Sequence, residues 1–185
     1  MKIIQFIFVL MFWMATSVFF PIQAQERKEL NSGLGFGFQV SQFQDDFGFG
    51  LNMTSPHVFQ GHGAFRLKAN QAYYEHLLDG EYVWSGYQNF SLGFVGFGGR
   101  IGEGLRLYGE GGIIGIIPSE RFSTEKLRLS TYGTFGFEFF TTPAFNYFIE
   151  LGVVTSRARA DKIVGNPFYS NGFVASVGFR INLEK

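Results

Sequence analysis

Seven charged residues in this sequence could form ion pairs or bind ions, and each lies between two apolar residues or glycines. They are Arg66, Lys68, Arg106, Glu110, Glu138, Glu150 and Arg180. Successive side chains of a β-strand point to opposite faces, so these charges share a face from which their apolar neighbours are turned away. Enclosed charges must be paired, because a buried charge without a partner costs several kcal/mol. Four of the seven come from four consecutive predicted strands. If these strands are neighbours and the four side chains point inward near one end, we expect Arg106 to pair with Glu138 and Arg180 with Glu150.

Paired charges on one face of a sheet allow two interpretations if that sheet closes into a barrel. The first is an ion path or gate that crosses the lumen. The second is a salt-bridged plug, because a small barrel is filled by its own side chains rather than open as a channel. We expect the plug, and the pore or small-molecule binder is the alternative.

Catalysis would require a different set of residues, and the histidines are the candidates for a catalytic base. The three histidines are His57, His62 and His76. The first two have no carboxylate nearby, and a hydrolase would need a histidine as its base. His76 has Glu75 and Asp79 beside it and Ser85 a little further on, so a lipid-modifying triad can be imagined there. The spacing does not demand one, and we expect no catalytic residue, no metal site, no cofactor and no enzymatic activity.

The elements that must position these charges are β-strands. In the stretch "NGFVASVGFRINL" at 171–183, every second residue from Phe173 to Leu183 is apolar. Seven earlier segments alternate in the same way, which is typical of half-buried strands. The eight segments are 34–41, 47–54, 65–70, 90–95, 105–110, 134–139, 147–153 and 171–183. Together with their continuations they approach the length of about ten residues that a tilted strand needs to cross a membrane.

The composition points to the same class of protein. The 185 residues include 25 Phe and 25 Gly, so phenylalanine alone outnumbers the 15 acidic residues. Aromatic residues suit a lipid-facing wall, and glycine suits the crowded interior of a small barrel. The formal net charge is zero, so no basic surface for nucleic acid is indicated.

The beginning of the chain predicts export. Lys2 precedes an apolar run at 3–20, and a Pro-Ile-Gln-Ala stretch ending at Ala24 leads into a polar segment. This order is typical of a cleaved signal peptide, with an uncleaved membrane anchor as the alternative. We therefore divide the chain into a signal peptide at 1–24 and one barrel domain at 25–185. The sequence has no cysteine, which excludes a lipoprotein anchor, disulfides and cysteine-ligated metal sites.

The connections between the eight segments alternate in length. The long ones are at 73–88, 118–128 and 155–171, whereas 102–104 and 141–146 are short or modest. Two connections fit less well, because 42–46 is short for an outer loop and 55–63 is long for a periplasmic turn. Outer-membrane barrels have long outer loops and short periplasmic turns. The sequence therefore predicts an all-β fold, an eight-stranded antiparallel up-and-down transmembrane β-barrel. A soluble lipocalin-like barrel or a sandwich is the alternative.

With its Phe- and Gly-rich strands, its signal peptide and its last strand "FVASVGFRINL", the chain resembles small eight-stranded outer-membrane proteins of the OmpA, OmpX and OmpW type. The resemblance covers the whole mature chain and is one of architecture. It implies a porin-like barrel in the outer membrane of a Gram-negative bacterium and insertion by the barrel-assembly machinery. The family's last strand commonly ends in an aromatic residue, whereas here Phe179 is followed by Ile181 and Leu183.

These observations predict an integral outer-membrane barrel with a structural or surface-interaction role. A narrow pore is the second candidate function and a lipid-modifying enzyme the third. The loops at 118–128 and 155–171 carry six basic against three acidic side chains, which favours lipopolysaccharide phosphates as a neighbour. The expected partners are outer-membrane lipid, lipopolysaccharide and the assembly machinery, with no nucleic acid, and the protein is expected to be a monomer.

Overall fold

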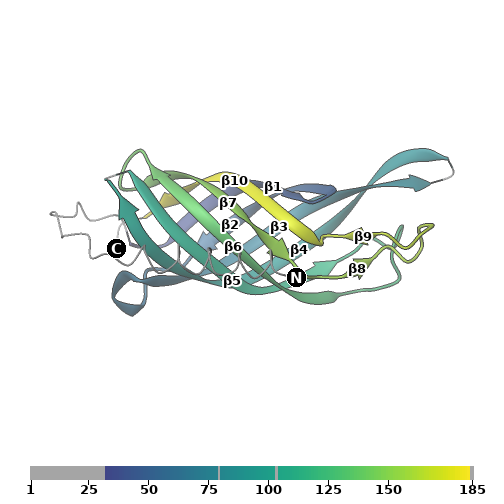
Figure 1. The fold of residues 1–185 in the computed structure, drawn as a ribbon, viewed down its shortest axis with the longest axis horizontal. Helices are drawn as coiled ribbons and strands as arrows, with labels where there is room; N and C mark the ends of the chain where they lie inside the picture. The colour runs from purple at the N-terminus through teal and green to yellow at the C-terminus, as the bar shows by residue number, and fades with distance from the viewer. Residues whose placement is uncertain (1–31, 79, 103, 184–185) are drawn as a thin grey trace, which may run out of the picture.

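The structure is a computed structural model, and it describes residues 32–78, 80–102 and 104–183. Eight long strands form a closed barrel in the order β1-β10-β7-β6-β5-β4-β3-β2, and each pairs antiparallel with its neighbours. They are β1 (Gly35–Phe43), β2 (Asp46–Thr54), β3 (Gly63–Leu78), β4 (Glu81–Ile101), β5 (Leu105–Ile117), β6 (Arg128–Phe140), β7 (Phe145–Val154) and β10 (Gly172–Asn182). Figure 1 shows the tilted strands winding around one axis. The predicted eight-stranded barrel is confirmed, whereas the predicted signal peptide at 1–24 lies outside the described residues.

The two ends of the barrel differ. We call the end at which β1 begins and β10 ends the proximal end, and it also holds the connections at 55–62, 102–104 and 141–144. One of these contains a short 3₁₀ turn, η1 (Phe59–Gly61). The opposite, distal end holds the connections at 44–45, 79–80, 118–127 and 155–171. The last of them contains a small hairpin of β8 (Ala158–Arg159) and β9 (Phe168–Tyr169).

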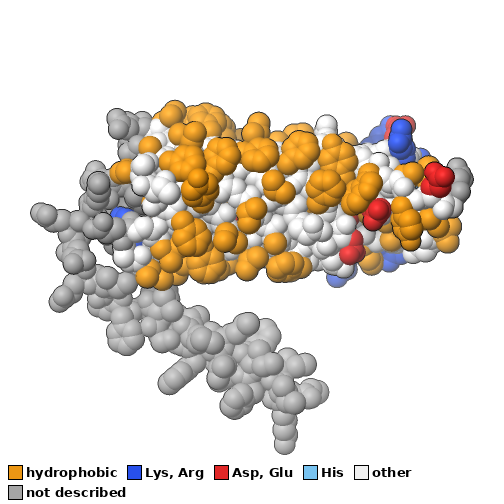
Figure 2. Space-filling model, turned by 90° about the horizontal axis from the view of Figure 1, so that it is seen from above, with side chains coloured by type: hydrophobic (Ala, Val, Ile, Leu, Met, Phe, Trp, Pro, Cys, Tyr) orange, Lys and Arg blue, Asp and Glu red, His pale blue; other side chains and the backbone are white. Residues whose placement is uncertain are grey.

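The barrel is apolar outside and polar inside. Along β1 and β2, buried and exposed residues alternate without a break. The exposed row of β10 contains Phe173, Val177, Phe179 and Ile181, whereas Ser176 and Arg180 are buried. Figure 2 shows the resulting band of hydrophobic side chains, with charged side chains gathered mostly at the distal end. A lipocalin-like barrel would show the reverse distribution, so the soluble alternative is wrong and the outward face is one that lipid must cover.

The sequence-based prediction of a long distal loop at 73–88 is wrong. The segment is a hairpin in which β3 runs on to Leu78 and β4 begins at Glu81, with pairing from Tyr73–Gly86 to Leu78–Glu81. The alternation simply continues, because Tyr74, His76, Ser85 and Tyr87 are buried against the distal loops. The connection at 42–46, already short in the sequence, contains only Gln44 and Asp45 between β1 and β2.

Among the described residues, helical structure is confined to the short turn η1. Within 32–78, 80–102 and 104–183, no helix is long and apolar enough to cross a membrane.

Candidate functional site: the barrel interior

The interior is built in three layers, and the inward row of β3 passes through all of them. From the proximal side this row reads Arg66, Lys68, Asn70, Ala72 and Tyr74, and every one of these side chains is buried. The seven charged residues form the proximal layer, amide side chains form the middle layer and aromatic rings form the distal layer. One alternating strand therefore sets the position of each layer.

Two glutamates organise one half of the charged layer. Arg66 donates from Nη1 to Glu110 Oε2 at 2.7 Å and to Glu150 Oε1 at 3.1 Å. Lys68 Nζ lies 3.0 Å from Glu110 Oε1 and 2.8 Å from Glu150 Oε2. Both carboxylates are thus bridged by the same two cations. Such bridging satisfies most of the lone pairs that burial deprives of water.

Glu138 organises the other half. Arg106 donates from Nε to Glu138 Oε2 at 2.7 Å, and Arg180 Nη1 donates to Glu138 Oε1. The pairing of Arg106 with Glu138 is as expected. Arg180 also lies within ion-pair distance of Glu150, with their closest atoms 3.9 Å apart, but its hydrogen bond goes to Glu138. The structure thus brings all seven residues together as four cations around three shared carboxylates.

Tyrosines and glycines complete the charged layer, and sequence reasoning did not single them out. Tyr108 donates its hydroxyl to Glu150 at 2.6 Å, and Tyr132 donates to Glu110 at 2.6 Å. A Cβ atom at Gly136 would overlap the Tyr108 ring, and one at Gly93 would overlap the Tyr132 hydroxyl. Inward glycines therefore make the room that the tyrosine rings fill. The alternation of glycine with apolar residues was the available signal.

The middle layer carries no charge. Gln39 donates to Asn70 at 2.9 Å and accepts from Asn52 at 3.1 Å, and Asn70 donates to Asn89 at 2.7 Å. Ser41 and Ser176 share a further bond of 2.8 Å. The amide side chains link four adjacent strands of the ring, β1 to β4. They connect the charged layer to the aromatic rings above it.

The distal layer is an aromatic cap. Tyr74 and Tyr87 from the long hairpin pack against Phe122 of the loop at 118–127 and Tyr169 of β9, with ring centroids 4.9 to 6.2 Å apart. Phe43 of β1 belongs to the same buried cluster. Burial raises the pKa of Tyr169 to about 12, so its hydroxyl stays protonated at neutral pH. The cap closes the barrel mouth with side chains from three separate connections.

Asp46 fastens this cap to the barrel wall. Its Oδ2 accepts the Tyr87 hydroxyl at 2.7 Å and the backbone N–H of Ser170 at 2.6 Å. Ser170 has a φ of 47°, in the left-handed region that non-glycine residues seldom occupy. One buried carboxylate thus holds both the hairpin and the loop at 155–171.

The histidines do not assemble a catalytic site. His76 Nε2 lies 2.8 Å from Ser85 Oγ, so the two residues that could start a triad do meet. Both are buried, and His76 Nδ1 has no hydrogen-bond partner, so no carboxylate orients the ring. His62 bonds the Phe59 carbonyl, and His57 packs on Phe97. Among the residues the structure describes, no three His, Cys, Asp or Glu side chains are grouped to hold a metal ion.

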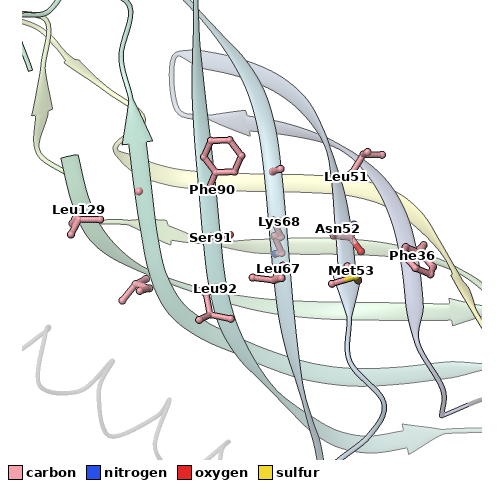
Figure 3. Close-up of a pocket in the computed structure, with 13 residues that line it drawn as sticks. Phe36, Leu51, Asn52, Met53, Leu67, Lys68, Phe90, Ser91, Leu92 and Leu129 are labelled. Atoms are coloured by element: carbon pink, nitrogen blue, oxygen red, sulfur yellow. The ribbon is translucent and has the colours of Figure 1, made fainter. Parts of the chain in front are cut away.

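The outer wall carries an apolar groove of about 620 Å³. Figure 3 shows that it runs across strands β1 to β6, with Leu51, Met53, Leu67 and Phe90 among its walls. Small residues, Ala69 and Gly115, leave the hollow between these larger side chains. The groove belongs to the outward apolar surface and is not an entrance at either end of the barrel.

No family model matches this chain, and no curated protein matches its sequence. Solved structures do resemble it. The N-terminal β-barrel domain of Pseudomonas aeruginosa OprF is 13% identical with a TM-score of 0.61, and the match covers 84% of this chain and 100% of that one. The outer membrane protein OprG from the same organism is 13% identical with a TM-score of 0.57, covering 86% and 100%. At this identity the likeness concerns the fold, and it confirms the eight-stranded transmembrane β-barrel.

Proposed function

We propose that this protein is an integral outer-membrane β-barrel with a structural or surface-interaction role, and that its own side chains seal its lumen. It is neither a channel nor an enzyme in this proposal. The apolar outward face, the signal-peptide pattern at 1–24 and the likeness to OprF and OprG support the outer membrane as its location.

The filled interior carries the proposal. The charged layer, the amide layer and the aromatic cap lie one above the other along the barrel, and the charged layer joins strands on opposite sides of the ring. An ion would have to displace carboxylates that already have two or more donors, and then pass rings that contact one another. Eight-stranded barrels are just wide enough for side chains to fill them, which agrees with this packing.

The environment supplies the proposed partners. Outer-membrane lipid covers the apolar wall, and the groove between Ala69 and Gly115 accommodates acyl chains. Lipopolysaccharide phosphates lie near the distal end, where exposed cations such as Arg121 and Lys126 reach them. The barrel-assembly machinery inserts the chain, with β10 as the strand that closes the barrel against β1.

Planar-bilayer recording of the refolded protein tests the sealed lumen. We expect no conductance steps from the wild type under conditions in which a general porin, refolded in the same way, gives clear steps. Regular steps from correctly folded wild-type protein would overturn the seal and make a narrow pore the better function. Folding is checked in the same sample by the heat-dependent shift of the barrel on an SDS gel.

A further inference from the structure

The distal rim is divided into an acidic half and a basic half. Going around the ring, the four distal connections follow in the order 44–45, 79–80, 118–127 and 155–171. The first two belong to the acidic half, which exposes Asp45, Glu75 and Glu81. The last two belong to the basic half, with six basic against three acidic side chains over 118–128 and 155–171.

The charges on both halves are available for a partner. Across the described ranges, Arg128 with Glu125 is the one salt bridge outside the barrel interior. Exposed cations that form no salt bridge there are Arg121, Lys126, Arg157, Arg159 and Lys162. Lys162 Nζ donates to the Glu120 carbonyl and the Arg159 guanidinium lies over the Phe168 ring, so both keep their charge without a carboxylate partner. None of the three exposed acids of the acidic half forms a salt bridge either. The molecule therefore has an in-plane dipole at its distal end that its own fold does not neutralise.

The acidic half projects as a hairpin. Pairing of β2 with β3 ends at Phe47–Tyr73, and pairing of β4 with β5 ends at Gln88–Ile117. Beyond these points β3 and β4 pair only with each other, so the hairpin has two free edges in the described structure. Its outward face exposes Tyr82 at 77% and also Leu77 and Trp84. Figure 1 shows it extending past the barrel mouth.

The basic half has a matching projection on the opposite side. The loop at 155–171 joins β7 to β10, and two strands separate it from the β3–β4 hairpin in each direction around the ring. Val164 lies between β8 and β9 and is 100% exposed, and Phe168 of β9 is exposed as well. Arg159 and Lys162 lie on the same loop. Each side of the rim thus combines unpaired charge of one sign with exposed apolar side chains.

We propose that copies of this protein associate side by side in the membrane, with the β3–β4 hairpin of one copy docked on the 155–171 loop of the next. Glu75 and Glu81 meet Arg159 and Lys162, and Tyr82 packs near Val164. The two surfaces differ and lie on opposite sides, so the contact is heterologous and repeats into rows rather than closing as a dimer.

The contact needs both charged and apolar side chains, because each kind contributes differently to association. Exposed ion pairs alone contribute little, and salt screens them, so charge here sets orientation and register. Exposed aromatic and aliphatic residues add the buried area that makes the contact persist. Lipopolysaccharide phosphates could occupy the basic loop, but they would leave the acidic, aromatic hairpin without a partner. A second copy accounts for both surfaces. The sequence-based prediction of a monomer was made without knowing where these charges lie around the ring.

Cysteine crosslinking tests the contact directly, because the chain has no cysteine of its own. Tyr82→Cys and Val164→Cys are made in separate, full-length proteins, which are reconstituted in vesicles and treated with a short bis-maleimide. We expect dimers when the two variants are mixed and almost none from either alone. A chain with both substitutions should give a ladder of dimers, trimers and higher species. Equal crosslinking by a single variant, or none in the mixture, would overturn the proposal.

Charge exchange and lipid composition provide the controls. Glu75→Lys with Glu81→Lys should lower the crosslinking yield by roughly fivefold or more, because like charges then face each other. Arg159→Glu with Lys162→Glu on the partner should restore it, whereas Lys126→Glu in the neighbouring loop should not change it. The same yields are expected with lipopolysaccharide in the vesicles. Loss of crosslinks on adding lipopolysaccharide would show that the loop binds its phosphates instead, and would overturn self-association.

Discussion

At the scale of single residues, glycine and tyrosine fill the lumen as complementary pairs. Gly136 lies directly across from Tyr108 on the neighbouring strand, and the Tyr108 ring occupies the space that a side chain at 136 would need. The ring has little freedom to move, because its hydroxyl bonds Glu150 and the Arg66 guanidinium lies 5.1 Å from its centre. In the charged layer, glycine residues thus leave the space that the tyrosine rings occupy.

We expect Gly136→Ala to destabilise the barrel by roughly 1–3 kcal/mol, the usual range for adding a methyl group to a packed interior. The Tyr108 ring would have to leave its position and lengthen its bond to Glu150. The measurement is the free energy of unfolding in denaturant, with the protein in lipid vesicles.

Gly109→Ala is the matched control, since it lies on the outward face of β5 and a Cβ there would meet nothing within 4 Å. It should be neutral or slightly stabilising, because alanine reduces the freedom of the unfolded chain. Equal effects at 109 and 136 would contradict the interlocking of Gly136 with Tyr108.

Strand alternation was sufficient to predict which residues point inward, and all seven charged residues are buried as expected. It was not sufficient to predict partners. Arg180 and Glu138 lie on strands separated by β7, yet the long arginine side chain crosses that gap to bond Glu138. Pairing depends on strand register, tilt and side-chain length, and a sequence pattern contains none of these directly.

At the scale of elements, strands β3 and β4 are longer than the sequence predicted, because they continue into the distal hairpin. Residues 73–88 were expected to be a long connection between two shorter strands at 65–70 and 90–95. Their alternation is intact, with Tyr74, His76, Ser85 and Tyr87 on the buried face. The strands extend because Phe122 and Tyr169 cover that face. Those two residues lie on other loops, so the cause of the extension is a tertiary contact.

Asp46 is predicted to hold the 155–171 loop against this hairpin. Asp46→Ala removes the acceptor for both the Tyr87 hydroxyl and the Ser170 N–H. Bonds to a charged acceptor are worth about 2 kcal/mol, so amide hydrogen exchange at Ser170 should quicken by roughly 30-fold. Asp45→Ala, at the exposed neighbouring position, should leave that exchange unchanged. Faster exchange along β10 as well would mean that Asp46 stabilises the whole barrel and not the loop alone.

At the scale of the whole molecule, the distribution of polar and apolar side chains indicates the environment of each face of the barrel wall. Charged and amide side chains fill the inside, while Phe, Leu, Ile and Val cover the outside. An exterior of this kind is stable only in lipid, and the interior is stable only because its charges are paired. The sequence predicted this division well, because alternation is a local property that eight strands repeat. The closed mouth was not predicted, since it depends on contacts among three distant connections.

Two of the interior layers act as barriers in series, which leads to a prediction about the complete barrel. Glu138→Ala with Arg180→Ala opens space in the charged layer, and Tyr87→Ala with Phe122→Ala opens the aromatic cap. Current through barriers in series is limited by the tighter one, so neither double variant should conduct appreciably. The variant with all four substitutions should give conductance steps in planar bilayers. Each variant must first show the SDS-gel shift of a folded barrel. Steps from the cap variant alone would mean that the charged layer admits ions, and steps from the charge variant alone would mean that the cap does not close the mouth.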